Sequence, residues 1–246
     1  MRTRLAMLVD EVFWPPSQVA NLAAWHDMQE THSGDGTSVR NMVTAVDWSE
    51  ATNPPGYDAT GFNGLPCLTF NGTSQRILST EAGPLAAFVG STKALTYIAV
   101  VSPASGDQLS AIFGAGNSGA AANHSWRLGM LNTGSGILNI SKRGTSGTVT
   151  ASSAAQAPST PKVITYWTDG STASIWTNLN RELNAAAFVD LEATTPNRLA
   201  IGALPTSTVG NFFSGKWACG LLYTRAISDL EIVGLVRGQM SRWGIA

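Results

Sequence analysis

The C-terminal segment, residues 213–246, predicts a strand that leads directly into a short helix. Ser228 can accept a hydrogen bond from the amide of Glu231 while the Glu231 carboxylate reaches back to the Ser228 amide, which is a capping box. The helix is therefore expected over residues 229–243, with Gly244 as the left-handed residue that ends it.

One face of this helix is apolar. Apolar residues recur at helical spacing, at Ile232, Leu235, Val236, Met240 and Trp243. The charged residues fall mostly off this stripe. We therefore expect the helix to pack across one edge of the domain.

The region before this segment is typical of an all-β domain. Short apolar or β-branched stretches are separated by clusters of Gly, Asn, Asp, Ser and Pro. Residues 95–101 are apolar at consecutive positions, which predicts a central strand covered on both faces. Residues 163–168 and 173–177 predict a hairpin, and 178–184 a loop after it. The inner faces of the sheets are expected to hold Tyr97, Val101, Val163, Trp167, Leu199, Ile201 and Leu221.

Length and cysteine content favour a single domain with free thiols. All-β domains of 246 residues are common, so we expect one sandwich over residues 22–246, preceded by an arm over 1–21. Phe13 and Trp14 make this arm apolar enough to need a partner surface, either its own domain or another chain. The two cysteines, both in strand-like segments, favour buried thiols over a disulfide.

Charge excludes several classes of partner. Charged residues make up 13% of the chain, the net charge is -1, and Lys and Arg form no cluster. We therefore expect no nucleic-acid binding and no membrane insertion. The short apolar stretch near Met1 is interrupted by Asp10 and Glu11, so no signal peptide is expected.

Four motifs, in their order and spacing, resemble the concanavalin A-like lectin/glucanase superfamily, in its laminin G-like jelly-roll branch. They are Trp25-His26-Asp27 at a strand end, Ser33 to Gly36, Asn63 to Gly72, and Phe213 to Ser228. The resemblance spans nearly the whole chain and implies an antiparallel jelly-roll β-sandwich of two sheets with a short C-terminal helix. This scaffold hosts enzymes, lectins and structural modules.

A copy without a secretion signal resembles those found in bacteriophage particles. This resemblance implies a non-enzymatic structural or adhesion protein of the virion, made in the host cytoplasm, for capsid decoration or a head or tail fibre. Its partners would be other virion proteins or identical subunits, with host-surface glycans as candidate ligands. A bacterial lectin-like carbohydrate-binding module is the alternative, and a carbohydrate-active hydrolase the third.

Catalytic motifs are absent from the sequence. Glucanases of this superfamily carry a Glu-x-Asp-x-x-Glu strand, which this chain lacks, and helix capping explains Asp229 and Glu231. No Gly-x-Ser-x-Gly elbow occurs, and the histidines His26, His32 and His124 have no zinc-site spacing and are expected at the surface or in loops. We expect no catalytic residues.

A match to the phosphate-binding P-loop runs from Gly210 to Lys216 and fails at Trp217, where Ser or Thr belongs. A P-loop opens a helix, whereas Lys216 is expected to begin a strand. Nucleotide binding is therefore not expected.

Glycan binding would need an aromatic face beside amide and carboxylate groups. One long loop region offers Trp48, Asn53, Tyr57, Asp58 and Asn63, and Trp126 offers a second possibility. The competing interpretation is that these tryptophans anchor loops or fill the core.

No cofactor is expected from the sequence, with calcium as the one candidate, because relatives of this fold often hold one at a sandwich rim. Asp27, Asp35 and Asp58 are the candidate ligands, since calcium prefers oxygen donors. The competing interpretation is that these carboxylates bond to the backbone of their own turns.

Overall fold

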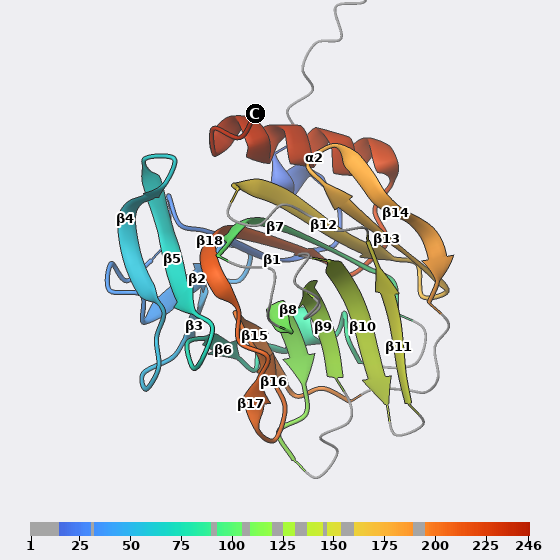
Figure 1. The fold of residues 1–246 in the computed structure, drawn as a ribbon, viewed down its shortest axis with the longest axis horizontal. Coiled ribbons are helices and arrows are strands. Elements are labelled where there is room, and N and C mark those ends of the chain that lie inside the picture. The colour runs from blue at the N-terminus through green and yellow to red at the C-terminus, as the bar shows by residue number, and fades with distance from the viewer. Residues whose placement is uncertain are drawn as a thin grey trace, which may run out of the picture.

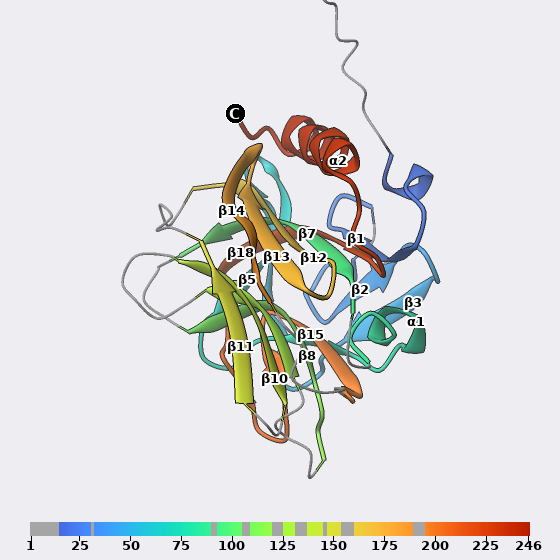
Figure 2. The same ribbon diagram turned by 90° about the vertical axis from the view of Figure 1, so that its right-hand side faces the viewer.

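Two antiparallel sheets pack face to face, and helix α2 (Asp229–Arg242) lies across the outer face of one of them (Figure 1). The computed structural model describes residues 15–30, 32–89, 93–104, 109–119, 125–130, 137–144, 147–153, 160–188 and 195–246. Figure 2 shows the three layers, helix, sheet and sheet, from the side. The predicted fold class, an antiparallel β-sandwich with a short C-terminal helix, is confirmed.

Sheet A is the sheet under α2. Its strands, in spatial order, are β14 (Asn180–Ala187), β13 (Thr172–Thr177), β12 (Lys162–Thr168), β7 (Leu95–Pro103), β18 (Ser214–Tyr223), β5 (Leu65–Asn71) and β4 (Gly56–Phe62), with β1 (Leu22–Asp27) also paired to β18.

Sheet B forms the opposite layer. Its strands, in spatial order, are β11 (Gly147–Ser152), β10 (Leu138–Gly144), β9 (Ser125–Met130), β8 (Ser110–Gly116), β15 (Arg198–Ile201), β6 (Ile77–Ser79), β3 (Val46–Ser49) and β2 (Ser38–Asn41). Four short elements complete the described residues: η1 (Pro16–Gln18), α1 (Ala82–Leu85), β16 (Leu204–Pro205) and β17 (Val209–Gly210).

The main core lies between the two sheets. Tyr97 of β7 packs against Phe113 of β8, with their ring centroids 4.6 Å apart. Val101, Leu199 and Ile201 share this inner layer and are fully buried. The predicted central strand β7 is confirmed, since all of its residues except Ser102 are buried.

Three residues predicted on the inner faces lie on the other side of sheet A. Val163 and Leu221 are fully buried, but pairing with Val100 and Ile98 places them on the face that α2 covers. Trp167 also faces this side and donates from Nε1 to the Ile227 carbonyl at 2.9 Å. The correction follows from sheet A being apolar on both faces, so that sequence pattern does not distinguish them.

Helix α2 is held by its predicted cap and by contacts at its far end. The capping box between Ser228 and Glu231 is present, and Gly244 has φ of +61°. Trp243 is fully buried in edge-to-face contact with Phe62. Arg242 pairs with the buried Asp27 carboxylate at 2.9 Å. Burying a side chain as large as Trp243 stabilises the fold by about 2–3 kcal/mol.

The described part of the predicted N-terminal arm, from residue 15, packs against the sandwich. Val19 is buried, and the Pro16 carbonyl accepts a hydrogen bond from the Tyr223 hydroxyl at 3.2 Å. Phe13 and Trp14, the predicted docking residues, lie outside the described residues, so their role stays a prediction.

The segment predicted as a loop over 178–184 is wrong in part. Asn178 makes the turn, with φ of +53°, and edge strand β14 then begins at Asn180. Arg181 of this strand lies 4.4 Å above the Trp176 ring and pairs with Asp229 of α2. An exposed edge strand has few apolar residues, so its sequence resembles a loop.

Both cysteines, Cys67 and Cys219, are buried free thiols, as the sequence favours. Burial raises the pKa of Cys67 to about 11. Within the described part of the chain, no helix is both long and apolar enough to cross a membrane.

His26 is buried in the core, which corrects its expected surface position. Its ring lies edge-on to Trp48, with centroids 4.3 Å apart, and its buried Nε2 atom has no hydrogen-bond partner among the described residues. Desolvation lowers the pKa of His26 to about 3. The imidazole is therefore neutral in the folded protein at neutral pH.

Replacing Glu231 by Gln should lower the free energy of unfolding by about 1 kcal/mol at neutral pH. Hydrogen bonding from Arg225 lowers the pKa of Glu231 to about 2, below its unfolded value. The stabilisation is therefore present above pH ~4.3 and is lost as pH falls toward ~2, where the two proteins should converge. Urea unfolding at a series of pH values measures this, with Leu230→Ala, 71% exposed, as the near-neutral control. A constant difference at every pH would contradict the assignment.

Replacing His26 by Phe should make the free energy of unfolding fall less steeply as pH is lowered from 7 to 5. The folded pKa of about 3 lies below the unfolded value of 6.5, so unfolding takes up a proton as pH falls through this window. Wild type should therefore lose about 2 kcal/mol more than the variant between pH 7 and pH 5. Denaturant titrations across this range test it, and parallel curves for the two proteins would refute it.

Candidate functional site

The outer face of sheet B is hollowed over its β2, β3, β6 and β15 strands. Two adjoining hollows, of about 320 and 540 Å³, share Asp47 in their lining, and we call them together the outer-face groove. Both volumes fall in the range of small-molecule sites. The ionisable side chains of the groove are Glu30, His32, Arg40, Asp47, Glu81 and Arg198.

Strand alternation explains why these side chains face outward. In β3, Trp48 points into the core, so its neighbours Asp47 and Ser49 point to solvent. Arg40 pairs with Asp47 in the β2–β3 register and lies on the same face. Adjacent positions of β3 therefore supply a buried residue, Trp48, and a polar residue of the groove, Asp47.

Beyond β15, the chain itself covers the outer face of strand β8 of sheet B. Gly114 of β8 lies against this cover, where an added Cβ would come within 2.5 Å of the Ala203 carbonyl oxygen. β16, which follows Ala203, packs on the same strand. The groove thus occupies the part of the face that β16 leaves open.

Asp47 and Arg198 are unengaged groove residues. Within the part of the chain that the structure describes, neither side chain makes a hydrogen bond or ion pair. Both line the larger hollow. An anionic acceptor and a guanidinium donor are therefore available there to a ligand.

Glu81, which precedes α1, is held from behind by the core. Trp48 donates from Nε1 to Glu81 Oε2 at 2.7 Å, and the Asn41 amide donates to both carboxylate oxygens at 3.1 Å. These bonds fix the orientation of a carboxylate at the rim of the larger hollow.

Trp48 therefore does not present a face to a sugar, and this prediction is corrected. Its side chain is 0% exposed, between His26 and Phe113. Trp126 is corrected in the same way, because it is buried against Phe88 and donates to its carbonyl oxygen at 3.2 Å. Both indoles lie on the inward face of their strands. The amino-acid composition does not reveal which face of a strand a side chain takes.

His32 forms a wall of the smaller hollow, with Tyr57 stacked behind it. The two ring centroids lie 4.5 Å apart, and the Tyr57 hydroxyl is 3.2 Å from His32 Nε2. The Gly34 amide donates to His32 Nδ1 at 2.9 Å. In the neutral imidazole Nε2 then carries the proton and donates to Tyr57, which leaves the phenol proton free to donate elsewhere.

The remaining predicted glycan residues do not gather with Tyr57. The Asn53 carbonyl accepts from the Arg76 amide, and Asp58 accepts from the Thr60 amide at 3.1 Å. Asn63 donates to the Trp243 carbonyl at 2.9 Å and so fastens the end of α2. The sequence-predicted set is therefore distributed over three parts of the molecule.

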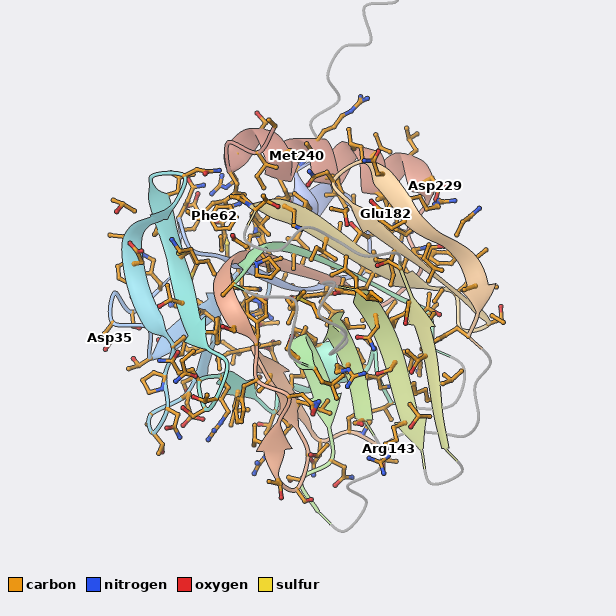
Figure 3. All side chains as sticks on the ribbon, viewed as in Figure 1. Asp35, Phe62, Arg143, Glu182, Asp229 and Met240 are labelled. Carbon is orange, nitrogen blue, oxygen red and sulfur yellow. The ribbon has the colours of Figure 1, made fainter. Side chains whose placement is uncertain are left out.

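The three candidate calcium ligands are likewise separate. Asp27 is buried against Arg242, whereas Asp35 accepts bonds from Ser33 and Thr37 in its own loop, which lower its pKa to about 2. Figure 3 shows Asp35 at the periphery of the molecule. Among the described residues, no three acidic, histidine or cysteine side chains gather as a metal site would require. These carboxylates serve turns and an ion pair instead.

The end of the P-loop-like stretch, from Ser214, is a strand, as predicted for Lys216. Lys216 lies inside β18, and Trp217 is buried in the core. No helix N-terminus stands there to bind phosphate.

No family model matches the chain, and no curated protein matches it in sequence. Solved structures do match its fold. Domain 4 of AbnA, an extracellular arabinanase from Geobacillus stearothermophilus, in complex with arabinotriose, has a TM-score of 0.61 at 14% identity, over 88% of this chain and 98% of that one.

Two sialidase structures are also similar. The CBM40 domain of the Ruminococcus gnavus IT-sialidase, bound to α2,3 sialyllactose, has a TM-score of 0.57 at 18% identity, over 69% of this chain and 96% of that one. A Trypanosoma rangeli sialidase has a TM-score of 0.55 at 17% identity, over 89% of this chain and 33% of that one. The chain therefore has the β-sandwich fold found in carbohydrate-binding domains.

Proposed function

We propose that this protein is a glycan-binding module whose ligand lies in the outer-face groove. The observation that carries the proposal is the set of unengaged or prepositioned polar groups there: Asp47, Glu81 and Arg198. Sugar hydroxyls both donate and accept, so a site for them needs carboxylate acceptors beside guanidinium donors.

The charges of the groove favour a neutral glycan. Glu30, Asp47 and Glu81 oppose Arg40 and Arg198, so neither sign dominates the lining. Apolar surface is available from Leu78 and from Val46, whose side chain is 44% exposed. The C–H face of a sugar ring would rest on these side chains while its hydroxyls bond to the charged groups.

The fold comparisons support this reading over the virion hypothesis. The arabinanase and CBM40 domains carry bound oligosaccharides, whereas none of the structures described above is a virion protein. At 14–18% identity the likeness supports a shared scaffold and does not specify a sugar. The proposal therefore takes the lectin-like alternative.

Replacing Asp47 by Asn should weaken binding of a neutral oligosaccharide by about tenfold or more, because the substitution removes a charged acceptor shared by both hollows. A neutral-glycan array identifies the ligand, and titration calorimetry measures the change.

Asp229→Asn is the matched control, since Asp229 lies on α2 and pairs with Arg181 away from the groove. Equal affinities of wild type and Asp47→Asn would exclude this groove, and absence of any binding on the array would refute glycan binding. Release of reducing sugar would instead indicate the hydrolase alternative.

Replacing Trp48 by Phe should reduce both stability and glycan affinity. The variant loses the indole N–H group that donates to Glu81, so its free energy of unfolding should be about 1–3 kcal/mol lower than that of wild type. Trp167→Phe is the control, because it loses a comparable indole bond, to Ile227, beneath α2. We expect both variants to be less stable in urea titrations, and only Trp48→Phe to bind glycan less tightly. Equal glycan affinities of the two variants would show that Glu81 does not contribute to glycan binding.

A further inference from the structure

The corner of sheet A that α2 leaves uncovered holds a pocket of about 460 Å³. Thr69, Ser102 and Lys216 come from β5, β7 and β18, and the strand register pairs Lys216 with both of the others. Because paired residues share a face, two hydroxyls flank one ammonium group on the floor of this pocket. Phe62, at one end, is labelled in Figure 3.

Lys216 is a partly buried cation that makes no ion pair among the described residues, although the Asp58 carboxylate lies close to Gly61 on the same sheet. Its Nζ atom donates to the Gly61 carbonyl at 2.5 Å. Within the described part of the chain it makes no ion pair, and no carboxylate lines the pocket. An ammonium group has three donors, so two remain after the bond to Gly61. Partial burial of an unpaired charge is costly, and a ligand anion would offset that cost.

The walls of the pocket are apolar. Pro103 and Pro161 line it beside Phe62. A ligand that fills this space therefore needs an anionic group for Lys216 and a compact apolar face for the prolines.

We propose that this pocket binds a small organic anion, a carboxylate or sulfate group carried on a single ring. The ammonium of Lys216 pairs with the anion, the hydroxyls of Thr69 and Ser102 donate to it, and the ring lies against Pro103 and Pro161. The site lies on the opposite side of the sandwich from the outer-face groove and does not depend on glycan binding there. The two sites differ in charge, since the groove contains three carboxylates and the pocket none.

The test uses glucuronate as the probe, with glucose as its neutral counterpart, in NMR titrations of the isotope-labelled full chain at low salt. Glucuronate should shift the backbone amides of Gly61, Gly215 and Lys216 in a saturable way, and sodium sulfate should compete with it. Glucose should leave these amides unchanged. Added sodium chloride should weaken binding, because one charge pair carries it.

Lys216→Met should weaken glucuronate binding by roughly tenfold or more, while Lys93→Met, which removes the same charge outside the pocket, should not. Ser102→Ala, which leaves the lysine in place, should give a smaller loss and serves if Lys216→Met does not fold. Asp47→Asn should leave glucuronate binding intact, so failure at one site is distinguishable from failure at the other. Shifts that are equally large with glucose, or binding that survives Lys216→Met, would overturn the proposal.

Discussion

The architecture depends on the burial of both faces of sheet A. Strand β7 is apolar at consecutive positions, so neither of its faces can be left to water. Sheet B covers one face and helix α2 covers the other. Sheet B packs its inner face on sheet A, and the part of its outer face over β2, β3, β6 and β15 is available for polar side chains. The position of the groove and the position of the uncovered Lys216 corner both follow from this asymmetry.

The core also shapes the chemistry of the groove. Trp48 fills space between the sheets, yet its one polar atom holds Glu81 at the surface. His26 lies behind Trp48 and stays neutral because burial disfavours its charged form. Rigid packing behind a polar rim keeps the Glu81 carboxylate in one orientation, which would reduce the entropy lost on binding the proposed ligand.

Sequence reasoning succeeded where a feature depends on neighbouring residues. Two such features were predicted: the capping box of Ser228 and Glu231, and the strand that contains Lys216. Each depends on residues within a few positions of one another. It failed on β14, whose polar residues resemble a loop.

Sequence reasoning also failed on Trp48 and Trp126, which were candidates for glycan contact at the surface. In a strand, a shift of one position moves a side chain from the core to solvent, so aromatic content alone does not say which face an indole takes. Asp47, Glu81 and Arg198, on which the proposed site rests, belong to no sequence motif. Asp47 and Arg198 are far apart in the sequence. They line one hollow because sheet B places their strands, β3 and β15, on either side of β6.

The sequence by itself determined an all-β chain with a capped terminal helix and no polybasic surface, and it favoured free thiols over a disulfide, because composition, periodicity and local hydrogen bonding are readable along the chain. Only the tertiary structure decided which side of each strand faces water, which outer face α2 covers, and which distant polar groups share a hollow. Those outcomes depend on strand register and sheet order, and these arise from contacts between residues far apart in sequence.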